Sequence, residues 1–173
     1  MDSEPLHWSC WREVLSPLGI DLDWETYSRT CIGVTDIRVL QDLGLPMDVL
    51  AAKTERFRAT KLPIIESIID FIKTLSMYRL GIVSSSDRCD IEPVLVRAGI
   101  RDCFEVLVCG GDVRNHKPAP DPYLLAGRIL GIQRALVVED SYVGEQSARA
   151  AGFDVVRVRN VGELVSVAGA RLR

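Results

Sequence analysis

The feature that most constrains the fold is an alternation of short apolar runs and helical stretches after residue 78. Each apolar run is continuous, which is typical of strands that are buried on both faces of a parallel sheet. Helical stretches follow these runs and end at Gly99, Gly131 and Gly152. Strands are expected over residues 80–83, 104–109, 135–138 and 154–158. This order predicts an α/β fold in which helices cover both faces of one parallel sheet.

The first 75 residues differ, because their pattern is helical throughout. Ser3 can cap a first helix, and Pro5 is tolerated in the first turn of that helix. Breaks at glycine and proline residues separate the helices that follow. These further helices are expected over residues 23–30, 35–43, 46–59 and 62–75.

Composition excludes several classes of partner. With 173 residues, 47% of them hydrophobic, the chain can bury a full core. A net charge of −3 gives no support to nucleic-acid or anionic-membrane binding, which needs a basic face. No apolar run approaches the roughly 18–20 residues of a membrane span, and the N-terminus lacks the basic start of a secretory signal. We therefore expect no nucleic-acid or membrane partner; the pattern carries no signal for oligomeric state.

The five cysteines point to a reducing compartment. Their number is odd, and no two of them have the C-x-x-C spacing of a zinc site or a redox pair. Cys109 ends an apolar run, which favours a small buried thiol over a nucleophile. A cytoplasmic location is the prediction that follows.

Three of the expected strands lead into polar side chains. In an open parallel sheet, ligands bind beyond the carboxyl ends of the strands, so these side chains should meet at one edge. Hydroxyls, an ammonium and adjacent carboxylates together suit a phosphoryl group held beside a hard cation such as Mg²⁺. In chain order they are Ser84, Ser85, Ser86, Lys117, Glu139 and Asp140.

Each of these elements also has a purely structural interpretation. The serines from Ser84 onward could form a turn and a helix cap, and Lys117 could be a solvated surface lysine. Glu139 and Asp140 could cap the following helix. The coincidence of compatible chemistry at three strand ends favours the functional interpretation.

These segments resemble three of the four motifs of the haloacid dehalogenase superfamily, and most closely its β-phosphoglucomutase-like branch. The second motif is an apolar strand that ends in Ser or Thr, here the strand that ends at Ser84. The third is the lysine of a K-P-x-P-D loop, here residues 117–121, and the fourth is E-D-S-x-x-G, here residues 139–144. Residues 2–7 read D-S-E-P-L-H, which matches the stretch after the family's first motif.

The resemblance implies a role for each motif residue. Ser84 would hydrogen-bond the transferring phosphoryl group, and Lys117 would neutralise its charge. Asp140 would ligate Mg²⁺ directly, with Glu139 beside it, directly or through water. Ser85 and Ser86 would contact the substrate.

The resemblance also implies a division of the chain. Residues 1–16 would form a first core helix and hinge, residues 17–75 an α-helical cap, and residues 76–173 the α/β core. His7 near the hinge and Arg38 in the cap are the remaining substrate-binding candidates. For His7, an ordinary helix-surface position is an equally good interpretation.

The family's first motif, D-x-D-G-T/V, has no counterpart here. Its first Asp is the nucleophile and its second a general acid and base, yet only Met1 precedes Asp2. Asp21 and Asp23 have the spacing but follow no strand. The family often has Val where Met1 stands, so we expect the natural protein to extend upstream by roughly a dozen residues, a strand and its loop. The chain as written is predicted to be inactive.

The leading functional prediction is Mg²⁺-dependent hydrolysis of a small phosphorylated metabolite, such as a sugar phosphate, through an aspartyl-phosphate. A β-phosphoglucomutase-type isomerase is the first alternative. It is disfavoured because Asp36 stands where the mutases place a phosphate-gripping arginine, although Arg38 could substitute. A non-catalytic pseudo-enzyme and an inactive truncated product are the others.

Overall fold

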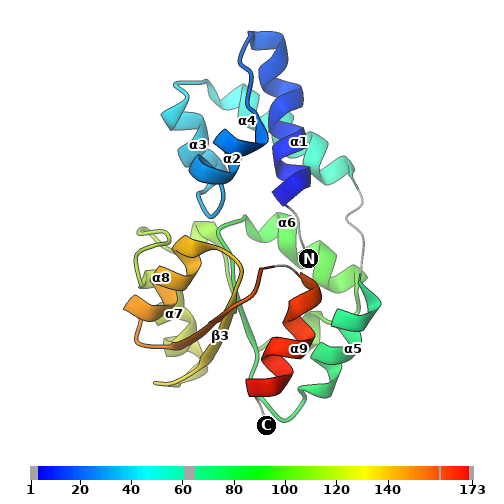
Figure 1. The fold of residues 1–173 in the computed structure, drawn as a ribbon, viewed down its shortest axis with the longest axis vertical. Helices are drawn as coiled ribbons and strands as arrows, with labels where there is room; N and C mark the ends of the chain where they lie inside the picture. The colour runs from blue at the N-terminus through cyan, green and yellow to red at the C-terminus, as the bar shows by residue number, and fades with distance from the viewer. Residues whose placement is uncertain (1–3, 61–64, 160, 172–173) are drawn as a thin grey trace. The chain divides into compact units, whose positions relative to one another are not determined.

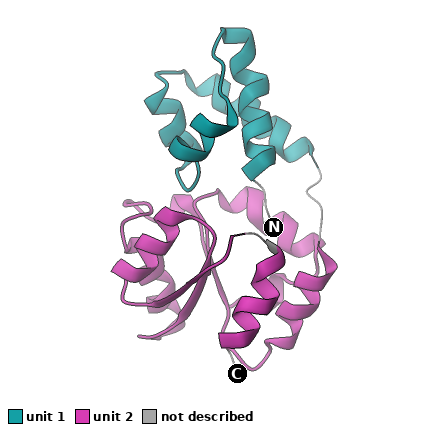
Figure 2. Cartoon of the chain, viewed as in Figure 1, with its two compact units in different colours: residues 1–63 teal, residues 64–173 magenta. Residues whose placement is uncertain are grey.

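The computed structural model describes residues 4–60, 65–159 and 161–171. The predicted cap residue Ser3 lies outside these ranges. The chain forms two compact units, unit 1 (residues 1–63) and unit 2 (residues 64–173), shown in Figure 2. The junction between the units lies N-terminal to the predicted cap–core boundary at residue 75. The predicted division into a first helix with hinge, a cap and a core, with boundaries at residues 16 and 75, stays a prediction.

Unit 1 is helical, as predicted. Asp23 caps the second helix by accepting a hydrogen bond from the Thr26 N–H at 2.7 Å, and Thr35 caps the third in the same way. Trp11 and Leu15 on the first helix are fully buried and pack in the core of the unit. The helices are α1 (Glu4–Leu15), α2 (Trp24–Thr30), α3 (Asp36–Asp42) and α4 (Met47–Ala59), with a 3-10 turn at Ser16–Leu18.

The strands of unit 2 are β1 (Gly81–Val83), β2 (Val106–Val108), β3 (Leu136–Glu139) and β4 (Asp154–Arg157). β1 pairs with β2 and β3 pairs with β4, both in parallel. Within the described residues, β1 and β3 are not hydrogen-bonded to each other, so the predicted sheet consists of two pairs. The resemblance implies that the family's missing first strand would lie between the strands that end at Ser84 and Glu139, and the break between the two pairs falls there.

Helices cover both faces of these strands. α7 packs on β1 and β2, α8 packs on β3 and β4, and α5 and α9 contact each other on the other side (Figure 1). The α/β prediction is therefore confirmed. The helices are α5 (Glu66–Thr74), α6 (Arg88–Arg97), α7 (Asp121–Leu130), α8 (Tyr142–Ala150) and α9 (Val161–Arg171), with 3-10 turns at Arg101–Cys103 and Gly110–Asp112.

Burial differs among the strands. All three residues of β2 are buried, whereas Ile82 and Val83 of β1 and the apolar residues of β3 are half-buried. Strands in a complete parallel α/β sheet are buried on both faces, so β1 and β3 retain apolar surface that such a sheet would cover. Among the residues described, no helix combines the length and apolarity that crossing a bilayer requires.

Cys109, directly after β2, has the properties of a structural thiol. Its side chain is buried, and burial raises its pKa to about 11. A thiol with that pKa is not the thiolate that nucleophilic attack needs. The interpretation of Cys109 as a core residue is confirmed.

Candidate active site

A rigid serine turn follows β1. The Ser84 N–H donates to the Val108 carbonyl at 2.9 Å, which extends the β1–β2 ladder by one bond. The Ser84 Oγ then accepts a hydrogen bond from the Ser86 N–H at 3.2 Å. Gly110 approaches the turn so closely that a Cβ there would lie 2.5 Å from the Ser85 carbonyl oxygen. Only glycine allows this approach of the backbone to the turn. Together with the two hydrogen bonds of Ser84, it keeps the Ser84 hydroxyl at the carboxyl end of β1.

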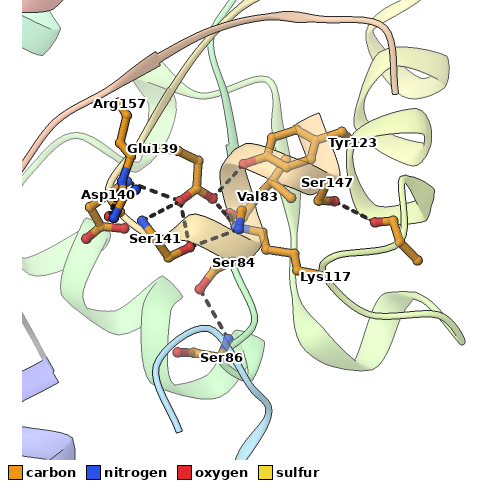
Figure 3. Close-up of polar contacts among 12 residues, drawn as sticks. Val83, Ser84, Ser86, Lys117, Tyr123, Glu139, Asp140, Ser141, Ser147 and Arg157 are labelled. Atoms are coloured by element: carbon orange, nitrogen blue, oxygen red, sulfur yellow. Dashed lines mark hydrogen bonds and ion pairs between the residues drawn. The ribbon is translucent and has the colours of Figure 1, made fainter. Parts of the chain in front are cut away.

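Lys117 lies across the ends of β1 and β3 (Figure 3). Its side chain is 7% exposed, and its ammonium donates to the Val83 carbonyl at 3.2 Å. The ammonium also forms an ion pair with Glu139 and lies 5.2 Å from the centre of the Tyr123 ring. A long, flexible side chain is thus held in one position by a backbone carbonyl, a carboxylate and an aromatic face.

The loop that presents Lys117 is anchored to α8 by a residue that sequence reasoning missed. Ser147 is fully buried, and its Oγ donates to the Ala119 carbonyl at 2.5 Å. Within the loop, the Ala119 N–H donates to the His116 carbonyl at 2.9 Å. No local pattern marks Ser147, because its partner lies 28 residues earlier in the chain.

Both carboxylate oxygens of Glu139 are engaged. Oε1 accepts from Lys117 and from the Tyr123 hydroxyl at 2.6 Å. Oε2 accepts from the Ser141 hydroxyl at 3.0 Å and from the Asp140 and Ser141 N–H groups. A Cβ on Gly144 would lie 2.1 Å from Oε1, so the glycine of the E-D-S-x-x-G segment lets α8 begin directly against this carboxylate.

These contacts fix the charge state of Glu139. Burial by itself raises its pKa, but the charge of Lys117 and the hydrogen bonds from Lys117, Tyr123 and Ser141 outweigh burial, so the pKa is lowered. Burial and the adjacent Glu139 charge raise the pKa of Tyr123, which keeps its hydroxyl a donor. Glu139 is therefore ionised at neutral pH, and its carboxylate is ion-paired with Lys117.

Asp140 differs from its neighbour. Its side chain is exposed, and within the described part of the chain its carboxylate accepts no hydrogen bond from another residue. Partial desolvation and the adjacent charge of Glu139 raise its pKa. The two adjacent acids therefore suit a hard cation. The Asp140 carboxylate is accessible, and the charge of Glu139 disfavours its ionised form. A bound cation would relieve this repulsion and would take the Asp140 oxygen as a ligand.

The structure brings the core residues of the prediction together. Ser84, Lys117, Glu139 and Asp140 lie around the carboxyl ends of β1 and β3 (Figure 3), with Ser85 and Ser86 in the adjoining turn. The other two candidates belong to unit 1. Arg38 is 65% exposed and pairs with Asp42 at 2.9 Å on the surface of α3. His7 lies on α1 and contacts Lys53, a residue that sequence reasoning missed.

Comparison with known proteins places this geometry in a family. A family model described as haloacid dehalogenase-like hydrolase matches residues 1–158. Fructose-1-phosphate phosphatase YqaB of Escherichia coli (strain K12) is 35% identical over 170 residues, 92% of this chain and 90% of that protein. Protein CbbY of Rhodobacter capsulatus is 32% identical over 90% of this chain and 78% of its own.

A solved structure agrees with the sequence matches. The crystal structure of CbbY from Rhodobacter sphaeroides in complex with phosphate is similar with a TM-score of 0.74 and 28% identity, over 92% of this chain and 81% of that one. The family model spans most of the chain, and the curated relatives exceed 30% identity along nearly its whole length. The chain therefore belongs to the haloacid dehalogenase-like hydrolase family.

Proposed function

We propose that this chain is the major part of a Mg²⁺-dependent phosphatase that hydrolyses a small phosphomonoester such as a sugar phosphate. The observation that carries the proposal is the arrangement of Lys117, held by Glu139, beside the Ser84 hydroxyl and the accessible Asp140 carboxylate. Similarity to a fructose-1-phosphate phosphatase supports the substrate class.

Each side chain has a role that its environment supports. The Ser84 hydroxyl would donate to an oxygen of the phosphoryl group, and the Lys117 ammonium would offset its negative charge. Asp140 would hold Mg²⁺, which supplies positive charge to the phosphoryl oxygens when bound. Because Glu139 already accepts five hydrogen bonds, we assign it to holding Lys117 and to contacts with the metal through water. Ser85 and Ser86 would line the same edge.

We further propose that the nucleophile is an aspartate supplied from outside residues 1–173. Its carboxylate would bond phosphorus while the bond to the leaving alcohol breaks, and water would then hydrolyse the aspartyl-phosphate to free phosphate. The strands β1 and β3 support this proposal. They are half-buried and belong to separate pairs, so each leaves an edge for a further strand. Lys117 lies at their carboxyl ends.

Hydrolysis of p-nitrophenyl phosphate, with and without Mg²⁺, tests the proposal. The 173-residue chain would be compared with a chain extended upstream by its in-frame codons. Mg²⁺-dependent activity in the extended form alone, lost in its Asp140→Asn variant, is the expected result. Inactivity of both forms would instead favour a pseudo-enzyme. A panel of sugar phosphates on the active form would then identify the substrate.

The mutase alternative receives less support. The Asp36 carboxylate, at the position where the mutases have an arginine, is occupied by Lys53 and by the Trp11 indole N–H. A carboxylate held there repels a second phosphate.

The five cysteines are free thiols, which supports our placement of the enzyme in a reducing cytoplasm.

A further inference from the structure

A salt bridge beside the serine turn has no part in the reaction proposed above. Arg88 is the first residue of α6, and its Nη2 donates to the Asp112 carboxylate at 2.8 Å. The same nitrogen donates to the Leu107 carbonyl of β2 at 2.7 Å. The two hydrogens of Nη2 are thus committed to two acceptors. Both side chains are partly exposed, so the pair contributes little to stability, and its position is the more informative feature.

The Leu107 carbonyl lies on the edge of β2 that faces away from β1. In the β1–β2 ladder, it is the Val108 carbonyl that accepts a hydrogen bond from β1, through the Ser84 N–H at 2.9 Å. Successive carbonyls of a strand point to opposite sides, so the Leu107 carbonyl points away from β1. The Arg88 guanidinium comes from the segment that follows β1, and it therefore reaches across the carboxyl end of β2 to the far edge.

Asp112 ties the guanidinium to the turn that follows β2. Its Oδ2 accepts from Arg88 and also from the Cys109 N–H at 2.8 Å. The Asp112 N–H donates back to the Cys109 carbonyl at 3.0 Å, which closes the turn. The next amide in this turn, the Gly110 N–H, donates to the Ser86 carbonyl at 3.0 Å. Asp112 therefore bonds both the guanidinium and the backbone of a turn that itself contacts the serine turn.

The serine turn is consequently tied to β2 and to the turn after it at three alternate residues. The ties are the Ser84 N–H, the Ser86 carbonyl and the Arg88 guanidinium. Within the serine turn, the Ser86 N–H donates to the Ser84 Oγ at 3.2 Å. That bond occupies a lone pair of the hydroxyl and leaves its hydrogen for another acceptor. The direction in which Ser84 donates therefore depends on where the Ser86 backbone is held.

We propose that Arg88 and Asp112 are positioning residues that hold the serine turn against the end of β2 and so direct the Ser84 hydroxyl toward the phosphoryl group. This use rests on the proposed function, whereas the tie between the two turns can be measured by itself. Arg88 acts through the backbone of the serine turn. Loss of either side chain should loosen that turn, although the two losses change the net charge in opposite directions.

Amide hydrogen exchange of the 173-residue chain measures the tie without any activity. In the wild-type chain, we expect the Ser84 and Gly110 amides to be protected, although both lie beyond the ends of their strands. Arg88→Met and Asp112→Ala should each speed their exchange by about tenfold, while the amides of the β3–β4 ladder keep their rates. Unprotected Ser84 and Gly110 amides in the wild-type chain would overturn the proposal, even if neither variant folds.

Two control variants remove exposed charges of the same signs elsewhere in unit 2. Arg128→Met lies on α7, and Asp102→Ala lies on the 3-10 turn before β2. Neither should change the exchange of the Ser84 and Gly110 amides. Equal exchange rates in the controls and in the two test variants would overturn the proposal.

Binding of inorganic phosphate in the presence of Mg²⁺, measured by calorimetry, separates position from charge. Charge alone predicts that Arg88→Met weakens phosphate binding and that Asp112→Ala strengthens it. The proposal predicts that both variants weaken it, by about fivefold, because both release the Ser84 hydroxyl. Unchanged or tighter binding by Asp112→Ala would overturn the proposal. A wild-type chain that binds no phosphate, with variants that lose amide protection, would contradict the proposed function and support the tie.

Discussion

The two units each bury one lysine against a carboxylate and an aromatic ring. Lys117 in unit 2 pairs with Glu139 beside Tyr123, and Lys53 in unit 1 pairs with Asp36 beside Phe57. The carboxylates differ in exposure, since the Glu139 side chain is 7% exposed and that of Asp36 is 32% exposed.

The surroundings of the two lysines differ as well. Lys117 bonds a backbone carbonyl at a strand end and lies beside the accessible Asp140, so its charge can act on a ligand there. The contacts of Lys53 are side chains on helices, and one of them is an imidazole. One lysine–carboxylate pair thus presents its charge at the end of a strand, whereas the similar pair in unit 1 is enclosed by side chains of helices.

The largest expected effect comes from breaking the pair in unit 2. Lys117→Met leaves Glu139 as a buried charge without its cation and should lower the free energy of unfolding by about 3–5 kcal/mol. Urea unfolding followed by far-ultraviolet circular dichroism measures this. The control is Lys73→Met, which removes an exposed lysine from α5. A loss equal to that of the control would contradict the account.

Breaking the pair in unit 1 should cost less. Lys53→Met should lower the free energy of unfolding by about 1–3 kcal/mol, because water can partly solvate the Asp36 carboxylate that remains. Tryptophan fluorescence reports this change, since Trp8, Trp11 and Trp24 all lie in unit 1. Arg29→Met, at an exposed position of α2, is the control. If Lys53→Met were more damaging than Lys117→Met, exposure of the carboxylate would not be the deciding factor.

The pH dependence of stability examines the unit 2 pair more finely. The folded pKa of Glu139 lies below its ordinary value of 4.5, so its contribution is fully present above pH 4.5 and is lost as pH falls through the folded pKa. The stability gap between wild type and Glu139→Gln should be constant from neutral pH down to that value. Below it, the gap should narrow by at most about 1.4 kcal/mol per pH unit. A gap that already narrows between pH 7 and pH 5 would contradict the lowered pKa.

The smallest effect concerns the anchor of the Lys117 loop. Ser147→Ala removes the buried hydrogen bond to the Ala119 carbonyl and should cost about 1 kcal/mol. Ser166→Ala is a matched control, because the exposed Ser166 hydroxyl makes a comparable bond to the Glu163 carbonyl at 3.0 Å. Thermal unfolding of both variants tests this, and equal shifts would show that burial of Ser147 adds nothing.

Much of the fold was predictable because its signals are local. Continuous apolar runs marked the four strands, and strand-end chemistry grouped Ser84, Lys117 and Asp140 correctly at one edge. The separation of the sheet into two pairs was harder to see in the pattern, because apolar runs do not reveal which strands pair.

The buried polar contacts were not predictable, because their partners are distant in sequence. Leu50, Lys53 and Phe57 occupy one buried face of α4, so Lys53 interrupts an apolar stripe and is easily taken for a surface residue. Its burial depends on Asp36, 17 residues earlier, and on His7, 46 residues earlier. Tyr123 likewise meets Glu139 across 16 residues.

The central claim is that the edge of unit 2 around Lys117 and Asp140 is built for a phosphoryl group beside Mg²⁺. Calorimetric titration of Mg²⁺ into the 173-residue chain tests it most directly, with Asp140→Asn as the site variant and Asp154→Asn, an exposed acid at the start of β4, as the control. The account predicts saturable binding that Asp140→Asn abolishes and Asp154→Asn preserves. Binding that survives in Asp140→Asn, or no saturable binding to the wild-type chain, would contradict it.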